Sequence, residues 1–428
     1  MTDDNKTVLR AGAGQYFDPI SFNSGALATE RRELFPVGTG PRTVPGTAIQ
    51  PPLDFTKIGP TRFSGADLLA VLPAIRAYQA QQLNPDNRDF TFRNIDLDKT
   101  GTNLSDPFSQ TPYALHLNLG VQRELVRNLS FSADFVWRRF LHNYISDIDY
   151  NHFNSSAGPA IPPCPPTEKS NLTTVCSNGP ITFDNTTGIA QDTALLLRLE
   201  KRFSHKTQFL MSYALASFKG SNGATGPGVV ATGFNNYNWF ENYGPLPTDL
   251  RHILNVSGFI ELPRDIQISL NVSAYSRPPF LAYVDGMDFN GDGTTNDLLP
   301  GTTVNQFNRG LGQEDLIRLV DLYNRDYAGK RTPGGRPAPP LVVPSNISFN
   351  DTFFTGDIRV SRTFSLSRER VHLVLFGDVF NLFNTANLVQ YSGNIADPTI
   401  FAQPGARFSQ VFGSGGPRAL QFGLRINF

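Results

Sequence analysis

The clearest pattern of apolar and polar positions lies at the end of the chain, between Arg418 and Phe428. Every second residue of this stretch is apolar, and the apolar positions are Leu420, Phe422, Leu424, Ile426 and Phe428. The residues between them are polar or small. Because successive side chains of a strand point to opposite faces, this alternation predicts a β-strand with one apolar face.

The same alternation recurs along the chain and predicts an all-β fold of about ten antiparallel strands. One example places Leu115, Leu117 and Leu119 on one face of a strand and His116 and Asn118 on the other. The predicted strands cover residues 7–17, 113–122, 129–139, 192–203, 207–218, 250–262, 265–276, 357–366, 370–381 and 418–428.

The connections between these strands alternate between short turns and long loops. Pro263 and Arg264 make up one turn, whereas the loop over residues 141–191 is long and rich in Pro, Asn and Thr. Such alternation is typical of a transmembrane β-barrel, which has short periplasmic turns and long extracellular loops. A strand of about eleven residues at ~3.3 Å per residue, tilted near 45°, spans roughly 25 Å, the height of an outer-membrane apolar band.

A soluble β-sandwich or propeller is the alternative, since its strands alternate in the same way. The asymmetry of loop lengths favours the membrane, and so do aromatic residues near strand ends, which gather at membrane interfaces. Those residues are Tyr113, Trp137, Phe203, Phe209 and Phe428. No apolar run approaches the ~18 residues of a membrane helix. Residues 64–83 have helical spacing and are expected to form a short helix that packs a loop.

Composition and charge narrow the range of partners. The 428 residues include 37 Lys and Arg and 37 Asp and Glu, so the formal net charge is zero. This balance argues against binding of nucleic acid through bulk charge. The first residues contain no apolar secretion signal, so either the protein stays inside the cell or the signal lies upstream of this chain. Cys164 and Cys176 share one Pro-rich loop, which favours a disulfide over two free thiols.

Several motifs occur in order along the chain. They are L-H-L-N-L-G-V-Q-R-E-L from Leu115, L-R-L-E-K-R-F-S from Leu197, D-L-R-H-I-L-N-V-S-G from Asp249, D-F-N-G-D-G-T-T-N-D from Asp288, D-V-F-N-L-F-N from Asp378 and the closing F-G-S-G-G-P-R-A-L-Q-F-G-L-R-I-N-F. This ordered set resembles the C-terminal barrel of TonB-dependent outer-membrane receptors. It is most similar to the Oar-like group, which carries a carboxypeptidase-regulatory-like domain.

The resemblance implies that residues 1–428 form one segment of a barrel in the bacterial outer membrane, partial relative to a 22-stranded barrel. The implied partners are outer-membrane lipid and the barrel strands and plug that this chain lacks. TonB would be reached only through that missing part. The complete receptor is expected to take up, or bind at the surface, a bulky solute. A structural or adhesive outer-membrane protein that transports nothing is the alternative.

No enzyme is expected, and neither catalytic residues nor a required cofactor are predicted. An omptin-like surface hydrolase would need Asp and His together at the extracellular rim. His116 and His372 instead lie in the middle of strands, on the polar faces that also carry Asp134 and Asp378. We expect these residues to be ordinary lumen residues. The charges predicted to face the lumen are Asp134, Arg138, Arg198, Glu200, Arg359, Asp378 and Arg425.

One loop has the spacing of a calcium site. The candidate oxygen ligands are Asp288, Asn290, Asp292, Thr294, Asn296 and Asp297. Gly293 stands where a calcium loop needs a sharp turn. Leu299 occupies the position of the usual bidentate carboxylate, so Asp297 would have to replace it. The alternative is a run of Asx turns that shapes a Gly-rich loop.

Overall fold

A single curved antiparallel sheet dominates the computed structural model. The structure describes residues 6–17, 102–105, 110–145, 148–149, 151–160, 162–163, 177–221, 235–366, 371–408 and 415–428. Ten strands follow one another as hydrogen-bonded neighbours, in the order β1-β3-β4-β5-β6-β8-β9-β10-β11-β14. They are β1 (Thr7–Phe17), β3 (Tyr113–Val126), β4 (Leu129–Ile145), β5 (Ile181–Ser204), β6 (Thr207–Gly220), β8 (His252–Leu262), β9 (Ile266–Tyr275), β10 (Phe353–Leu366), β11 (Val371–Phe380) and β14 (Ala419–Asn427). All ten predicted strands are present.

Tight turns join the strands in pairs at one end of the sheet. His205 and Lys206 connect β5 to β6 with φ values of 49° and 61°. Arg264 and Asp265, between β8 and β9, also have positive φ values, of 69° and 54°. Two consecutive residues with positive φ are characteristic of a type I′ turn, whose twist matches that of the flanking strands. These turns fix the hairpin register at this end.

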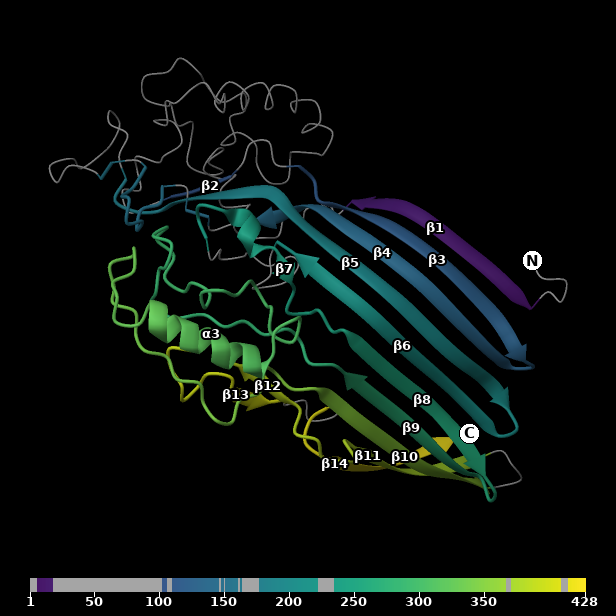
Figure 1. Cartoon of the computed structure of the whole chain (residues 1–428). Coiled ribbons are helices and arrows are strands. Elements are labelled where there is room, and N and C mark those ends of the chain that lie inside the picture. Colours follow the sequence, from purple (N-terminus) through teal and green to yellow (C-terminus); the bar gives the residue numbers. More distant parts are fainter. Residues whose placement is uncertain are drawn as a thin grey trace, which may run out of the picture.

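The strand ends that the long connections join lie together at the opposite end of the sheet (Figure 1). The start of β1 and the end of β14, in contrast, lie at the end that carries the tight turns. Within the described strands the sheet does not close on itself, since β1 pairs only with β3 and β14 only with β11. The segregation of short and long connections confirms the predicted organisation of a transmembrane barrel segment.

Several elements differ from the predictions. β5 begins at Ile181 rather than near residue 192, and its first residues pair in parallel with β2 (Thr102–Ser105). Alternation is absent from this extension, so periodicity could not reveal it. Further short elements are β7 (Gly244–Pro245), the 3-10 helix η2 (Trp239–Asn242), β12 (Leu388–Tyr391) and β13 (Pro404–Arg407). The helix expected over residues 64–83 lies outside the described residues.

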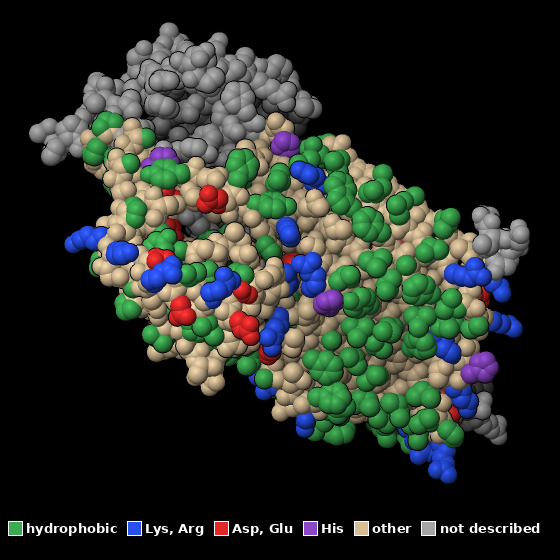
Figure 2. Space-filling view, viewed as in Figure 1, with side chains coloured by type: hydrophobic (Ala, Val, Ile, Leu, Met, Phe, Trp, Pro, Cys, Tyr) green, Lys and Arg blue, Asp and Glu red, His purple; other side chains and the backbone are tan. Residues whose placement is uncertain are grey.

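The apolar face of the sheet is open to its surroundings (Figure 2). Leu117, Phe135, Leu270 and Phe422 come from four different strands and remain 38%, 41%, 43% and 82% exposed. On the opposite, inner face, small polar residues such as Ser132 are buried. A soluble sandwich or propeller would bury the apolar face, so that alternative is wrong. The apolar face is the one that contacts lipid.

A buried core also exists outside the sheet, among the long loops. It consists mainly of residues from the connection between β9 and β10, joined by Ile395, Phe401 and Ala402 from the connection after β11. Helix α3 (Gln313–Asp326) covers this core with the buried side chains Leu316, Leu319, Val320 and Tyr323. No helix in the described part of the chain is long and apolar enough to cross a membrane. We call the packed residues 277–352 and 391–402 the extracellular module.

Candidate functional site

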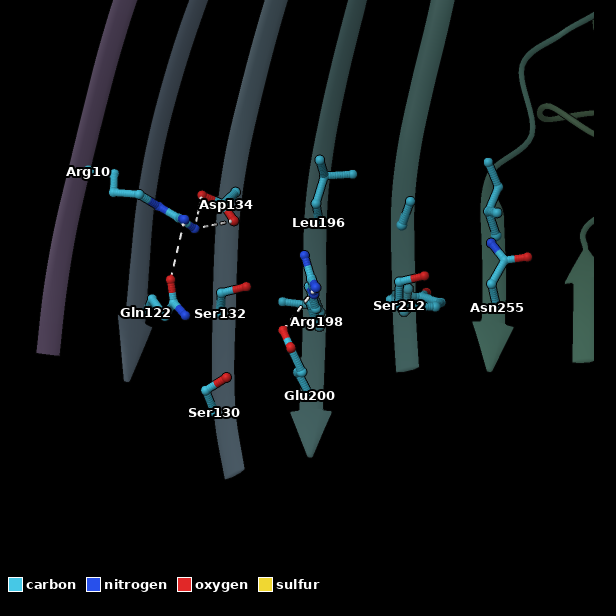
Figure 3. Close-up of a pocket in the computed structure, with 14 residues that line it drawn as sticks. Arg10, Gln122, Ser130, Ser132, Asp134, Leu196, Arg198, Glu200, Ser212 and Asn255 are labelled. Carbon is cyan, nitrogen blue, oxygen red and sulfur yellow. Dashed lines mark hydrogen bonds and ion pairs between the residues drawn. The ribbon is translucent and has the colours of Figure 1, made fainter. Parts of the chain in front are cut away.

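Ion pairs line the inner face of the sheet and enclose a pocket of about 410 Å³ (Figure 3). Arg10 of β1 crosses β3 and binds both carboxylate oxygens of Asp134 on β4 at 2.9 Å. In the same pocket, the Arg198 guanidinium donates a hydrogen bond of 2.8 Å to the carboxylate of Glu200, two residues further along β5. We call this the inner-wall pocket. Its paired charges and hydroxyl groups offer hydrogen bonds to a polar solute or to a protein element inside the barrel.

Two further ion pairs continue the polar inner wall. Arg359 of β10 binds Asp378 of β11 at 2.5 and 3.0 Å, directly across the strand pair. Arg138 of β4 reaches Asp192 of β5 at 3.4 Å. The predicted lumen charges therefore lie on the inner face. Four of them pair with one another, whereas Asp134 and Arg138 pair with Arg10 and Asp192. Arg10 was not predicted as a lumen charge, although it is the one charged residue in its strand.

An aromatic pair marks a second pocket, of about 230 Å³, where the inner wall meets the loops. Tyr275, at the end of β9, stacks on Phe353, at the start of β10, with ring centroids 4.9 Å apart and planes 15° from parallel. Asp351 and Gln390 also line this space. We call it the mouth pocket. Aromatic faces beside carboxylate and amide groups suit an amphipathic solute that buries an apolar surface and keeps some polar contacts.

A buried ion pair fixes the loops above the wall. Asp249, after β7, accepts a hydrogen bond from Arg309 Nε at 2.5 Å, and both side chains are almost completely buried. The other oxygen of Asp249 accepts from the backbone N–H of Phe218 at 2.7 Å. Removing one partner of such a pair would leave an uncompensated buried charge. The connection after β6 is therefore held firmly against the connection after β9.

The predicted calcium ligands lie together in one compact loop, residues 288–297, which we call the acidic loop. Asp288 accepts hydrogen bonds from the backbone N–H groups of Gly291 at 2.5 Å and Gly293 at 3.0 Å. Gly293 has a φ of +92°, and a Cβ there would lie 2.9 Å from backbone atoms of the neighbouring loop. The sharp turn expected at Gly293 is therefore confirmed.

The acidic loop, in the connection after β9, also binds the connections after β4 and after β6. Its Asp292 accepts a hydrogen bond from the backbone N–H of Asn236 at 2.5 Å. Its Gly291 carbonyl accepts from the backbone N–H of Ser156 and from the Tyr237 hydroxyl, both at 3.0 Å. Residues after β4 and after β6 are thus bound to the same loop. These contacts between loops could not be predicted from the sequence, because the partners lie more than fifty residues away from the acidic loop.

The acidic loop fits a metal ion only in part. Asp288, Asp292 and Asp297 are all buried, and burial raises the pKa of Asp297 to about 6, with a smaller contribution from the other two carboxylates. Each oxygen that accepts one hydrogen bond keeps a second lone pair for a cation. However, no group of three or more His, Cys, Asp or Glu side chains in the described residues is arranged to hold a metal ion. The calcium site stays a prediction.

The histidines and carboxylates considered for a hydrolase are placed apart on the wall. His116 lies against the ring of Tyr16, with centroids 4.5 Å apart, and His372 lies 3.3 Å from the Ser365 hydroxyl. Asp134 and Asp378 pair with arginines instead. The structure does not bring these residues together as an Asp and His site at the rim. Cys164 and Cys176 lie outside the described residues, so their disulfide stays a prediction.

Comparison with known proteins agrees with this geometry. Residues 1–421 match the family model described as the outer membrane beta barrel domain. No curated protein matches the chain. Solved structures similar to it include the outer membrane transporter YddB from Escherichia coli (11% identity, TM-score 0.41, covering 77% of this chain and 34% of the transporter). The siderophore receptor PiuA from Acinetobacter baumannii is similar at 10% identity (TM-score 0.36, covering 74% and 29%). The FrpB iron transporter from Neisseria meningitidis is similar at 9% identity (TM-score 0.34, covering 76% and 32%).

The fold, the lipid-facing surface and the family match define a segment of an outer-membrane β-barrel. This chain belongs to the outer membrane beta barrel domain family, and its place is the bacterial outer membrane. It spans about a third of the length of the first of these transporters. The resemblance to the barrel of TonB-dependent receptors, drawn from the motifs, agrees with the family match, while the Oar-like group stays a prediction.

Proposed function

We propose that the complete protein takes up, or binds at the cell surface, a bulky solute, and that this chain supplies part of the barrel wall and the loops that contact it. One observation carries the proposal: a polar inner wall runs up to an aromatic pocket at its extracellular end. A solute path needs this combination, because the upper pocket supplies affinity and the hydrated wall supplies a route that lipid does not fill.

The rigidity of the loops supports a binding role. The extracellular module has its own buried core, with Phe307 and Leu316 completely buried. The acidic loop and the Asp249–Arg309 pair tie this module to the neighbouring loops. Ordering these loops before binding lowers the entropy cost of binding a solute. Loops without such cross-links would have to order at the moment of binding.

The open edges of the sheet support a proposal of further strands. In the described strands, β1 and β14 each have one free edge. An unpaired backbone group in lipid costs several kcal/mol, so an open edge is not tolerated there. We propose that strands outside this chain pair with both edges. A plug inside the completed barrel would then lie against the inner wall, and TonB would act through that plug.

Uptake can be tested with the full-length protein in its own bacterium. A strain that lacks the gene and a strain complemented with it are grown in the same medium, and solutes lost from the medium are identified by mass spectrometry. The complemented strain is expected to deplete a solute that the deletion strain leaves. The double variant Tyr275→Ala with Phe353→Ala should slow this depletion about tenfold. Phe203→Ala, at the turn end of β5, is the control and should have no effect.

The location of the solute separates transport from adhesion. Recovery of the solute in the periplasm supports uptake, whereas a solute retained only on the cell surface supports the binding alternative. If neither depletion nor surface retention depends on the gene, the proposed function is wrong.

A further inference from the structure

The outward-facing positions of the sheet carry an uneven set of charges. Along the membrane-spanning length of the described strands, these positions include Arg and Lys but neither Asp nor Glu. The cations stand at the ends of the apolar band. On β5, the ten steps from Gln191 to Lys201 extend roughly 33 Å at about 3.3 Å per residue, or about 23 Å after a 45° tilt, which matches the apolar band.

Two of these cations lie side by side at the extracellular border. Arg139 of β4 pairs in register with Gln191 of β5, and Gln191 pairs with Lys219 of β6. Neighbouring strands are about 4.8 Å apart, so the two cations emerge roughly 10 Å apart on the same face, with an amide between them. Figure 2 shows Lys and Arg side chains along the border between the apolar band and the loops. Long basic side chains can reach a common anion across this distance.

The cations at the opposite border have partners within the protein. Lys201 donates to Ser204 and Thr207, with its shortest bonds at 2.6 Å. Arg362 stacks over the ring of Phe364 at 4.7 Å, and Arg123 donates to Thr7 at 2.9 Å. Arg139 and Lys219 are exposed and form no hydrogen bond or salt bridge with any residue that the structure describes. Among these outward-facing cations of the described strands, the adjacent pair without such a partner therefore lies at the extracellular border.

We propose that Arg139 and Lys219 bind the phosphate group of an anionic lipid in the outer leaflet, with the Gln191 amide as a further donor. Charge complementarity identifies the headgroup, since cations attract anionic lipid headgroups at about 1 kcal/mol each. The apolar face identifies the rest of the ligand. Phe135 and Leu195 lie four residues further along the same strands on the same face, and both are about 40% exposed. Acyl chains attached to the phosphate would cover them.

This arrangement favours a lipid over a free anion. Inorganic phosphate would gain only the two charge contacts, which are weak at an exposed site. A phosphorylated lipid gains these contacts together with burial of its acyl chains against β4, β5 and β6, at about 0.8 kcal/mol for each buried methylene group. The border position of Trp137, two residues from Arg139 on the same face, is also typical of an aromatic ring at headgroup level.

The test uses the full-length protein purified in dodecyl maltoside and titrated with diphosphoryl lipid A, with native mass spectrometry to count bound lipid. Saturable binding is expected. The double variant Arg139→Gln with Lys219→Gln should weaken it about tenfold, because two charge contacts are lost. The matched control is Arg202→Gln with Arg362→Gln, which removes two exposed cations at the turn end and should bind as the wild type does.

Two comparisons show whether the phosphate and the acyl chains both matter. We call the double variant Arg139→Gln with Lys219→Gln the border variant. Lipid A from which the phosphates have been removed should bind the wild-type protein about as weakly as diphosphoryl lipid A binds the border variant. Inorganic phosphate at millimolar concentration should not compete. The proposal is overturned if the border variant and the control bind equally, if the dephosphorylated lipid binds as well as the phosphorylated one, or if inorganic phosphate displaces the lipid.

Discussion

Arg10 of β1 binds Asp134 of β4 across the intervening strand, with one guanidinium nitrogen 2.9 Å from each carboxylate oxygen. The two residues can meet because Gly120 of β3 stands between them in register. A Cβ at Gly120 would overlap the Asp134 carboxylate. The charge pair therefore depends on a glycine and ties the outermost described strand to the third along the sheet.

Replacing Asp134 with Asn should weaken the attachment of β1. The pair is partly exposed, with side-chain exposures of 44% and 24%, so a loss of about 0.5–1 kcal/mol is expected. Hydrogen exchange of the β1 backbone amides in the full-length protein measures this loss. Glu200→Gln is the control, since Glu200 pairs with Arg198 within one strand. Equal effects of the two variants on β1 would contradict the cross-strand role.

Tyr323 offers a test of packing in the extracellular module. Its side chain is 1% exposed, and its buried hydroxyl has no hydrogen-bond partner among the described residues. Burial also raises the pKa of Tyr323 to about 12. Because an unsatisfied buried hydroxyl costs about 1–3 kcal/mol, Tyr323→Phe should leave the module as stable as before or stabilise it by about 1 kcal/mol. Hydrogen exchange of the α3 amides reports the change.

The comparison variant for this test is Phe307→Ala, in the same core. Phe307 is completely buried between Phe280 and Phe349, so its truncation should destabilise the module by about 3–5 kcal/mol. A loss of more than 1 kcal/mol for Tyr323→Phe would show that the hydroxyl has a partner after all.

Asp297 makes the acidic loop sensitive to pH. Burial raises its pKa in the folded protein to about 6, against about 3.9 in the unfolded chain. Between these values the folded state binds more protons than the unfolded state. The contribution of Asp297 to stability is therefore fully present below about pH 4 and is lost as the pH rises through about 6. In the presence of a chelator, Asp297→Asn should remove the pH dependence of hydrogen exchange at the α3 amides. Asp315→Asn is the control and should leave that pH dependence unchanged.

A hard cation is the remaining expectation for the same loop. If calcium binds the acidic loop, millimolar calcium should raise the free energy of opening of the extracellular module by RT ln(1 + [Ca²⁺]/Kd), or about 1–3 kcal/mol for 10 to 100 times the Kd. Asp292→Asn should abolish the gain, and magnesium should give less because it requires stricter geometry. No effect of calcium on wild-type α3 exchange would leave the Asx-turn alternative as the correct one.

Periodicity predicted the membrane-spanning part of the fold because lipid and lumen impose opposite demands on alternate side chains. Leu270 and Asn271 illustrate this, since one faces lipid and the other the inner wall. The same rule fails outside the membrane. The first residues of β5 show no alternation, and helix α3 has instead the helical spacing of its buried residues Leu316, Leu319, Val320 and Tyr323.

The candidate sites were predicted only where they depend on local sequence. The residues of the acidic loop lie close together in the chain, so their spacing revealed the loop. Its contacts with Asn236 and Ser156 depend on the tertiary arrangement and could not be predicted. The same holds for Tyr275 and Phe353, which are distant in sequence and become neighbours through the register of β9 and β10.

The orientation of the sheet in the membrane is the central claim, and spin labels along β9 test it most directly. Single cysteines at residues 266 to 274 of the full-length protein in lipid bilayers are labelled in turn, and their accessibility to oxygen and to a water-soluble nickel chelate is measured. We expect positions such as Ile268 and Leu270 to be accessible to oxygen, which concentrates in lipid. Positions such as Ser269 and Asn271 should instead favour the chelate or be protected. Apolar positions that are inaccessible to both reagents would contradict the account.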